Sequence, residues 1–213
     1  ALDMGIPVDE VHAKTGLVAH PTQKTGDRKP MLMAEISDKG AQLDLGQMSV
    51  DGTAELGNIL SHSELFDAYP HLRKTKVKFD PDGDVGAAFN PNTGQITISG
   101  ERPDEEVLSS LLHEVQHSIQ NFEGWQSGGS PNASIVGKYK EVLELHAEHR
   151  KAGTVTPDLR EKVREVAEAY DKEYTRYQKL AGEVQARVVQ GRKDLSEDEL
   201  RLIFPFGKDS APF

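Results

Sequence analysis

The stretch that decides the fold is PDEEVLSSLLHEVQHSIQNFEG, residues 103–124. Apolar side chains recur in it every three or four positions, which is the period of an amphipathic helix. This stripe consists of Val107, Leu108, Leu111, Leu112, Val115, Ile119 and Phe122. Pro103 at a first helical position, followed by three carboxylates, favours a helix start, and Gly124 favours its end. We therefore expect a central helix that buries one stripe against a sheet.

The same helix carries His113-Glu114-Val115-Gln116-His117, a match to H-E-x-x-H. Two imidazoles four residues apart project from one side of a helix and can bind one zinc ion together. At about 100° per residue they lie roughly opposite the centre of the apolar stripe, so we expect them to face a cleft. Glu114 lies beside them, where a general base can reach a water on the metal. A solvated polar helix face is the alternative interpretation.

A catalytic zinc ion needs a third protein ligand and an open position for water. Glu123 has the spacing of an extended motif, but Gln120 stands where a glycine would let the chain turn back. The next helical segment carries Glu141, Glu144, His146, Glu148 and His149, for which a charged solvent face is the alternative. Glu183 follows Gly182, which permits close approach of another backbone. An exposed ion pair of Glu183 with Arg187 is the alternative there.

Other segments predict a small sheet and more helices. Residues 75–79 alternate as a half-buried strand, and residues 85–99 have a hairpin signature around the turn formers at 90–94. Strand 95–99 alternates polar and apolar side chains, so we expect an edge or near-edge strand along which a peptide substrate adds. A charged helix is expected at 138–149, one long helix from 156 to 191, and a short acidic helix at 196–202.

Composition excludes several classes of function. The 35 acidic and 25 basic residues give a net charge of −10, which repels nucleic acid and anionic membranes. The absence of cysteine excludes disulfides, thiolate metal sites and a cysteine nucleophile, leaving histidine and carboxylates as metal ligands. No run approaches the roughly 18 apolar residues of a membrane span. Because the sequence begins with Ala1, we expect a piece of a longer polypeptide.

Two blocks of sequence carry a resemblance to a known family. The first is LHEVQHSIQ at 112–120 with EGW at 123–125 and GGSP at 128–131, and the second is YQKLAGEVQAR at 177–187 with Gln190 and Arg192. Together with the 86–98 hairpin, they resemble the zincin-like metallopeptidase domain of large polyvalent proteins from phages and mobile elements. The resemblance covers residues 85–192, about half of the chain. Gln185 departs from the family, which often has an acidic residue there.

The resemblance implies an α+β, zincin-like fold. In it a small mixed or antiparallel sheet packs on the H-E-x-x-H helix, and a long C-terminal helix carries the third ligand. It also implies one zinc ion per chain on His113, His117 and Glu183, with Glu114 as the catalytic base. The group that stabilises the oxyanion stays open among Tyr170, Tyr174, Tyr177, Arg187 and His146.

We therefore predict a zinc-dependent peptidase that acts on a peptide or protein, within a longer phage or mobile-element polyprotein whose other domains are candidate partners. A catalytically inactive zincin scaffold that serves binding or assembly is the alternative. We expect an irregular segment at 1–75 packed on the catalytic domain, a core at 76–192 with a helical insert at 138–172, and a tail at 193–213. The expected location is the cytoplasm, or a virion that delivers the protein to the host cytoplasm.

Overall fold

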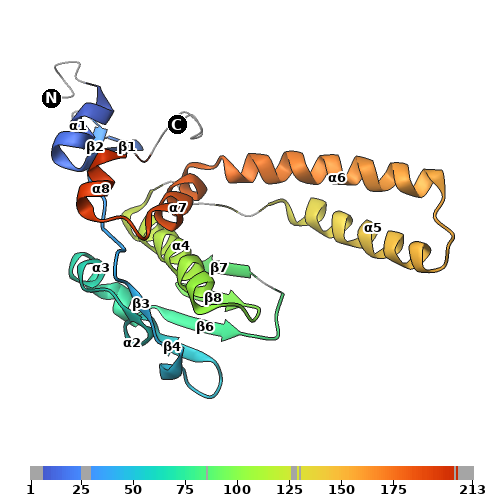
Figure 1. Ribbon diagram of the computed structural model, residues 1–213, viewed down its shortest axis with the longest axis horizontal. Coiled ribbons are helices and arrows are strands. Elements are labelled where there is room, and N and C mark those ends of the chain that lie inside the picture. The colour runs from blue at the N-terminus through green and yellow to red at the C-terminus, as the bar shows by residue number, and fades with distance from the viewer. Residues whose placement is uncertain are drawn as a thin grey trace.

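The computed structural model describes residues 7–24, 30–84, 86–125, 129, 131–203 and 205, and it confirms a mixed α+β chain (Figure 1). The elements that precede the central helix along the chain are α1 (Val8–Thr15), β1 (Leu17–Lys24), β2 (Pro30–Ala34), β3 (Gln42–Leu43), the 3₁₀ helix η2 (Leu45–Gln47), β4 (Thr53–Glu55), α2 (Leu56–Ile59), β5 (Leu60–Ser61), α3 (Ser63–Ala68), the 3₁₀ helix η3 (Pro70–Lys74), β6 (Lys76–Asp80), β7 (Gly86–Asn90) and β8 (Gln95–Ser99). The helices that follow are α4 (Asp104–Glu123), α5 (Ala133–Lys151), α6 (Pro157–Gln178), α7 (Ala181–Arg192) and α8 (Glu197–Leu202).

The main sheet has the strand order β4-β6-β8-β7, with β6 and β8 parallel and the other pairs antiparallel. Helix α4 packs on this sheet, where Ile96 and Ile98 of β8 are fully buried beneath it. Gly124 ends α4 in the left-handed conformation, at φ 68°, which glycine adopts without steric cost. The helix therefore begins and ends within a residue or two of the predicted positions.

The predicted stripe of α4 is buried except at its C-terminal end. Val107, Leu111, Leu112, Val115 and Ile119 lie in the hydrophobic core, and Leu108 packs partly against it. Phe122 was expected to join them, and that prediction is wrong, because its side chain is 60% exposed. It stacks instead on the His71 ring, with the two centroids 3.9 Å apart.

Strand β8 lies next to the edge of the sheet, one of the two places predicted for it, but it cannot pair with a substrate. Residues 95–99 were expected to receive a substrate strand, but β8 pairs with β6 on one side and with β7 on the other. Both rows of its backbone hydrogen-bonding groups face strands of the same sheet, so an added peptide cannot pair there. The edge strand on this side is β7.

The long helix expected from 156 to 191 is two helices. Helix α6 ends at Gln178, and α7 begins at Ala181 after Leu180, whose φ and ψ of −62° and 138° are extended. The Arg187 guanidinium donates a hydrogen bond to the carbonyl of Gln178, an acceptor left open at the end of α6. The break therefore places Glu183 in the first turn of a short separate helix.

Helices α5 and α6 form an antiparallel pair that extends away from the rest of the molecule, which we call the arm (Figure 1). It includes most of the predicted insert, residues 138–172. Buried side chains on its two helices are confined to Val142 and Leu159. Tyr139 and Tyr170 stack between the two helices with ring centroids 4.3 Å apart.

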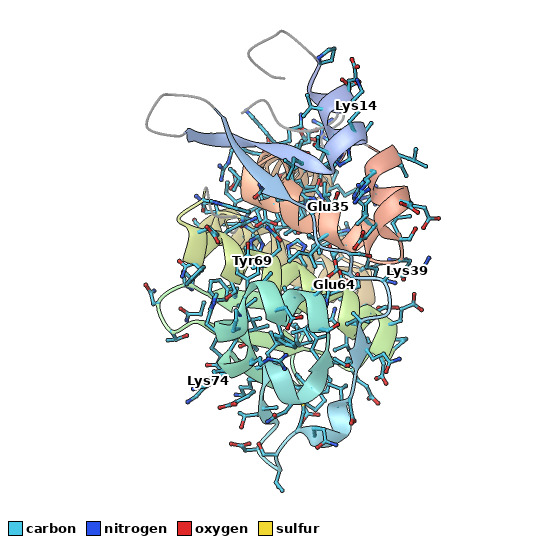
Figure 2. All side chains as sticks on the ribbon, turned by 90° about the vertical axis from the view of Figure 1, so that its left-hand side faces the viewer. Lys14, Glu35, Lys39, Glu64, Tyr69 and Lys74 are labelled. Carbon is cyan, nitrogen blue, oxygen red and sulfur yellow. The ribbon has the colours of Figure 1, made fainter. Side chains whose placement is uncertain are left out.

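The N-terminal and C-terminal parts of the chain meet beside α4 and the sheet. Arg192 of α7 donates two hydrogen bonds to the Glu35 carboxylate at 2.6 and 2.9 Å, and Figure 2 shows Glu35 where the β1–β2 hairpin meets the C-terminal helices. Leu56 and Leu72 share the core with α4, so residues before the predicted boundary at 75/76 pack on residues after it. That boundary stays a prediction, and residues 204 and 206–213 of the predicted tail lie outside the described residues.

None of the helices in the described part of the chain combines the length and the apolar character that crossing a membrane requires.

Candidate metal centre

Helix α4 places His113 and His117 one turn apart on the same face. Their rings lie edge to face with centroids 4.8 Å apart, and their Nε2 atoms are separated by 3.1 Å. Both side chains are largely buried, at 12% and 13% exposure, beneath helix α7. The spacing of four residues produces this geometry directly, because it turns the two side chains by only about 40° relative to one another.

Helix α7 brings Glu183 against the two imidazoles. One carboxylate oxygen, Oε2, lies 3.5 Å from Nε2 of His113, and the other, Oε1, lies 3.3 Å from Nε2 of His117. The side chain is 1% exposed. The structure therefore brings together the three residues named as metal ligands. Their ligand atoms lie close enough together to hold one metal ion, and they form the one such group found among the described residues.

The loop that follows α4 supports Glu183 from the opposite side. The Gly129 N–H donates to Oε1 of Glu183 at 3.0 Å. A Cβ atom at position 129 would lie 2.7 Å from Cδ1 of Leu180, so a larger residue there would displace the end of that side chain. Oε2 of Glu183 is buried and accepts no hydrogen bond from the described residues.

The donor set fits a divalent metal ion. Ligand atoms about 2.0–2.1 Å from a tetrahedral zinc ion lie about 3.3–3.4 Å from one another. The separations here are 3.1 Å between the two Nε2 atoms and 3.3 and 3.5 Å from them to the carboxylate oxygens. The buried oxygen of Glu183 that lacks a hydrogen bond is a further sign of a cation, because a buried carboxylate oxygen without a partner is costly.

Two glutamine side chains orient the imidazoles. Oε1 of Gln190 lies 3.0 Å from Nδ1 of His113, and Oε1 of Gln120 lies 2.9 Å from Nδ1 of His117. When Nδ1 donates to an amide oxygen, the lone pair of a neutral imidazole is on Nε2, the atom that faces Glu183. Both lone pairs then point into the same space as the carboxylate, an arrangement that favours a cation between them.

Glu114 lies in the same site but outside the group of three. Its side chain is buried and receives a hydrogen bond from the backbone N–H of Phe89 on β7. Burial raises the pKa of Glu114, and the neighbouring imidazoles of His117 and His113 oppose that shift. The predicted general base is therefore held by the edge strand and faces the same cleft as the candidate ligands.

The charges of the cluster shift the pKa values of its members. Burial alone would raise the pKa of Glu183, but the neighbouring imidazoles of His113 and His117 and the Tyr177 hydroxyl hold it well below its usual range. Burial would lower the pKa of His117, whereas the neighbouring Glu183 carboxylate and Gln120 amide raise it, and the net pKa is raised. Burial and the neighbouring Glu183 carboxylate raise the pKa of Tyr177.

A cleft of about 340 Å³ opens over these residues. One wall is the edge strand β7 with the turn that follows it, and the other contains Tyr177 and Pro131 from the base of the arm. The residues that line it are Ala87, Ala88, Phe89, Pro91, Glu114, His117, Asn121, Gly129, Pro131, Tyr177 and Glu183. Apart from Glu114, His117 and Glu183, none of these side chains carries an ionisable group that is charged near neutral pH.

The other candidates for the third ligand lie elsewhere. Glu123 accepts a hydrogen bond from Tyr69 and is not part of the group of three. His149 hydrogen-bonds Thr154 at the far end of the arm. The remaining arm candidates, Glu141, Glu144, His146 and Glu148, lie on α5, outside the group of three. The structure therefore leaves Glu183 as the third candidate ligand.

Sequence reasoning missed the roles of Gln120 and Gln190. Position 120 was considered only as a site where a glycine is missing, although spacings of four and seven residues put His117 and Gln120 on the face of His113. Gln190 has the same relation to Glu183, seven positions along α7. The helical period was therefore a signal that could have identified both.

Comparisons with known proteins returned no match of any of the three kinds sought: no family model, no curated protein and no solved structure resembles this chain closely enough to assign it.

Proposed function

We propose that the protein is a zinc-dependent peptidase with a zincin-like catalytic domain. The observation that carries the proposal is the convergence of His113, His117 and Glu183, two of which line a cleft together with Glu114. The H-E-x-x-H spacing supports zinc over other ions, because imidazole and carboxylate together suit a zinc ion with an open position. The resemblance of residues 85–192 supports its place in a longer phage or mobile-element polypeptide.

Zinc held by His113, His117 and Glu183 would supply a water of lowered pKa and polarise the carbonyl of the bond to be cleaved. Glu114 accepts the proton of the attacking water and returns it to the leaving amine, because its carboxylate lies in the cleft beside the ligands. Tyr177 lines the cleft beside Glu183, and its hydroxyl is a neutral donor available to the developing oxyanion.

The substrate strand adds to β7, in place of the predicted addition to β8. The Phe89 N–H faces away from β8, since it donates to Glu114, and the alternation of an antiparallel pair then turns the N–H and C=O of Ala87 outward as well. Ala87 and Ala88 are small enough to let a second backbone approach this edge. An extended peptide that pairs with Ala87 passes directly over the ligand cluster.

The inactive scaffold remains the alternative, and a fourth protein ligand that closes the metal site would have favoured it. His146 and His149 were the candidates for that ligand, and both lie on the arm, outside the group of three. Among the described residues the donor set stops at three, as in catalytic rather than structural zinc sites.

The test combines metal content with turnover. Protein prepared with sufficient zinc is expected to hold one equivalent, and less than about half an equivalent contradicts the proposal. Glu114→Gln should keep the zinc and lose peptide hydrolysis by about 10²–10⁴-fold, the usual contribution of a general base. Glu183→Gln should lose zinc affinity by more than the about 10- to 100-fold typical of an outer-sphere partner.

Glu106→Gln is the matched control for both variants, since Glu106 is an exposed carboxylate on α4. It should keep both zinc and turnover. Full zinc occupancy without hydrolysis of a broad peptide library would contradict the peptidase and favour the scaffold.

A further inference from the structure

Gln120 is wholly buried, and both ends of its amide are engaged. Its oxygen faces Nδ1 of His117 at 2.9 Å. Its nitrogen donates to the carbonyl of Gly182 at 2.9 Å and to Oε1 of Gln185 at 3.0 Å. One side chain of α4 therefore contacts a candidate ligand on its own helix and the first turn of α7, which carries another.

The contact with Gly182 decides which way the amide points. A backbone carbonyl can only accept a hydrogen bond, so the nitrogen of Gln120 faces α7 and its oxygen faces His117. The oxygen can only accept, so it pairs with a proton on Nδ1 of His117. The Glu183 carboxylate lies 3.3 Å from Nε2 on the other side of the ring, so Gln120 holds the imidazole at Nδ1 while Nε2 faces Glu183.

The same contact holds the backbone next to Glu183. Gly182 immediately precedes Glu183, and the two lie just after the break between α6 and α7. The first turn of α7 has no side-chain cap at Leu180. The hydrogen bond from Gln120 to Gly182 therefore joins this turn to α4, with Oε1 of Glu183 3.3 Å from Nε2 of His117.

We propose that Gln120 is the positioning residue that assembles this centre, because it holds the imidazole of His117 and docks the turn that carries Glu183. The residue at position 120 then determines which part of the chain supplies the third ligand. A glycine would let the chain turn back toward a ligand at position 123, whereas Gln120 continues the helix and docks a helix that carries its ligand 63 residues along the chain. The consequence for metal affinity rests on the proposed zinc site, whereas the consequence for the docking of α7 does not.

Two variants separate the two contacts. Gln120→Met keeps the length of the side chain and removes both hydrogen bonds. Gln120→Glu keeps an acceptor for His117 and places an oxygen against the Gly182 carbonyl. Gln116→Met is the matched control, since Gln116 lies one turn earlier on α4 and lines a different cavity.

The first measurement uses metal-free protein. Hydrogen exchange of the backbone amides of α7, followed by NMR, should be faster in Gln120→Met and in Gln120→Glu than in the wild type, because both variants lose the donor to the Gly182 carbonyl. Gln116→Met should keep the wild-type exchange rates. Unchanged exchange in α7 of folded Gln120→Met overturns the proposal, and Gln120→Glu supplies the same test if Gln120→Met does not fold.

The second measurement is zinc affinity by competition with a chelator, with urea unfolding of the metal-free proteins in parallel. Gln120→Met should lower the affinity by about 10- to 100-fold, the usual effect of losing an outer-sphere partner. The effect should shrink in a Glu183→Gln background, because the docking of Glu183 no longer contributes there. Loss of stability without loss of zinc affinity in folded protein overturns the proposal. If the wild type binds no zinc, the proposed function fails, and the hydrogen-exchange measurement alone decides the role of Gln120.

Discussion

Helices α4 and α6 have similar amphipathic patterns and opposite surroundings. Apolar residues recur every three or four positions in both. In α4 the stripe lies in the core and the opposite face carries the candidate ligands, whereas in α6 the buried residues are limited to Leu159. The pattern predicts a helix in each case, but the apolar stripe is buried in the core only in α4, because a sheet packs against that helix.

The largest expected difference between the two helices concerns packing. Leu111→Ala in α4 removes a fully buried side chain and should destabilise the protein by about 2–5 kcal/mol. Val163→Ala in α6 should cost less than about 1 kcal/mol, because that side chain is only half-buried in the arm. Urea unfolding of the two variants measures both losses. Equal losses would show that the arm is part of the core.

A second comparison uses two arginines that each form a paired contact with a glutamate. Arg192 and Glu35 are only 10% and 17% exposed, so Arg192→Gln leaves a mostly buried carboxylate uncompensated and should cost about 2–3 kcal/mol. Arg176, which pairs with Glu173 on the arm, is 59% exposed, so Arg176→Gln should shift the urea midpoint much less. The reverse order would contradict the assignment of the arm as a peripheral element.

The third prediction concerns the pKa of the arm glutamate. The hydrogen bonds from Arg176 and from the Asn132 N–H hold the pKa of Glu173 at about 2. A lowered pKa favours the folded state above the ordinary value of 4.5, and that contribution disappears as the pH falls toward 2. Side-chain NMR titration should show this low midpoint in the wild type and a midpoint nearer 4.5 in Arg176→Gln. An unchanged midpoint in the variant would exclude Arg176 as the main cause.

The smallest expected effect is that of shortening the arm. Replacing residues 144–164 by a glycine-rich turn removes its outer half and keeps the stack of Tyr139 on Tyr170 and the base of the arm. Zinc affinity should stay within about twofold of the full chain, because distant sites without shared partners couple by less than about 0.5 kcal/mol. Chelator competition measures it, and a large loss would show that the outer arm takes part in forming the metal centre.

Much of the fold and of the candidate site follows from local pattern. The hairpin around residues 90–94, the helix from 104 to 123 and the α+β class were all predictable, because turn formers and helical spacing act over a few residues. The pairing of β8 with strands on both sides was not, since the alternation of a strand does not say which strands pair with it. The exposure of Phe122 was missed for a similar reason: the period continues past the end of the sheet beneath it.

By itself the sequence determined the pairing of His113 with His117, because one helical turn brings residues i and i+4 together whatever surrounds them. Only the tertiary structure decided that α6 ends before Glu183 and that α7 docks on α4. No glycine or proline marks the break at 179–180, and the apolar stripe runs through it. The contacts made there by Gly129, Gln120 and Arg187 come from positions distant in sequence or from the far side of the break, and a local pattern carries no information about such partners.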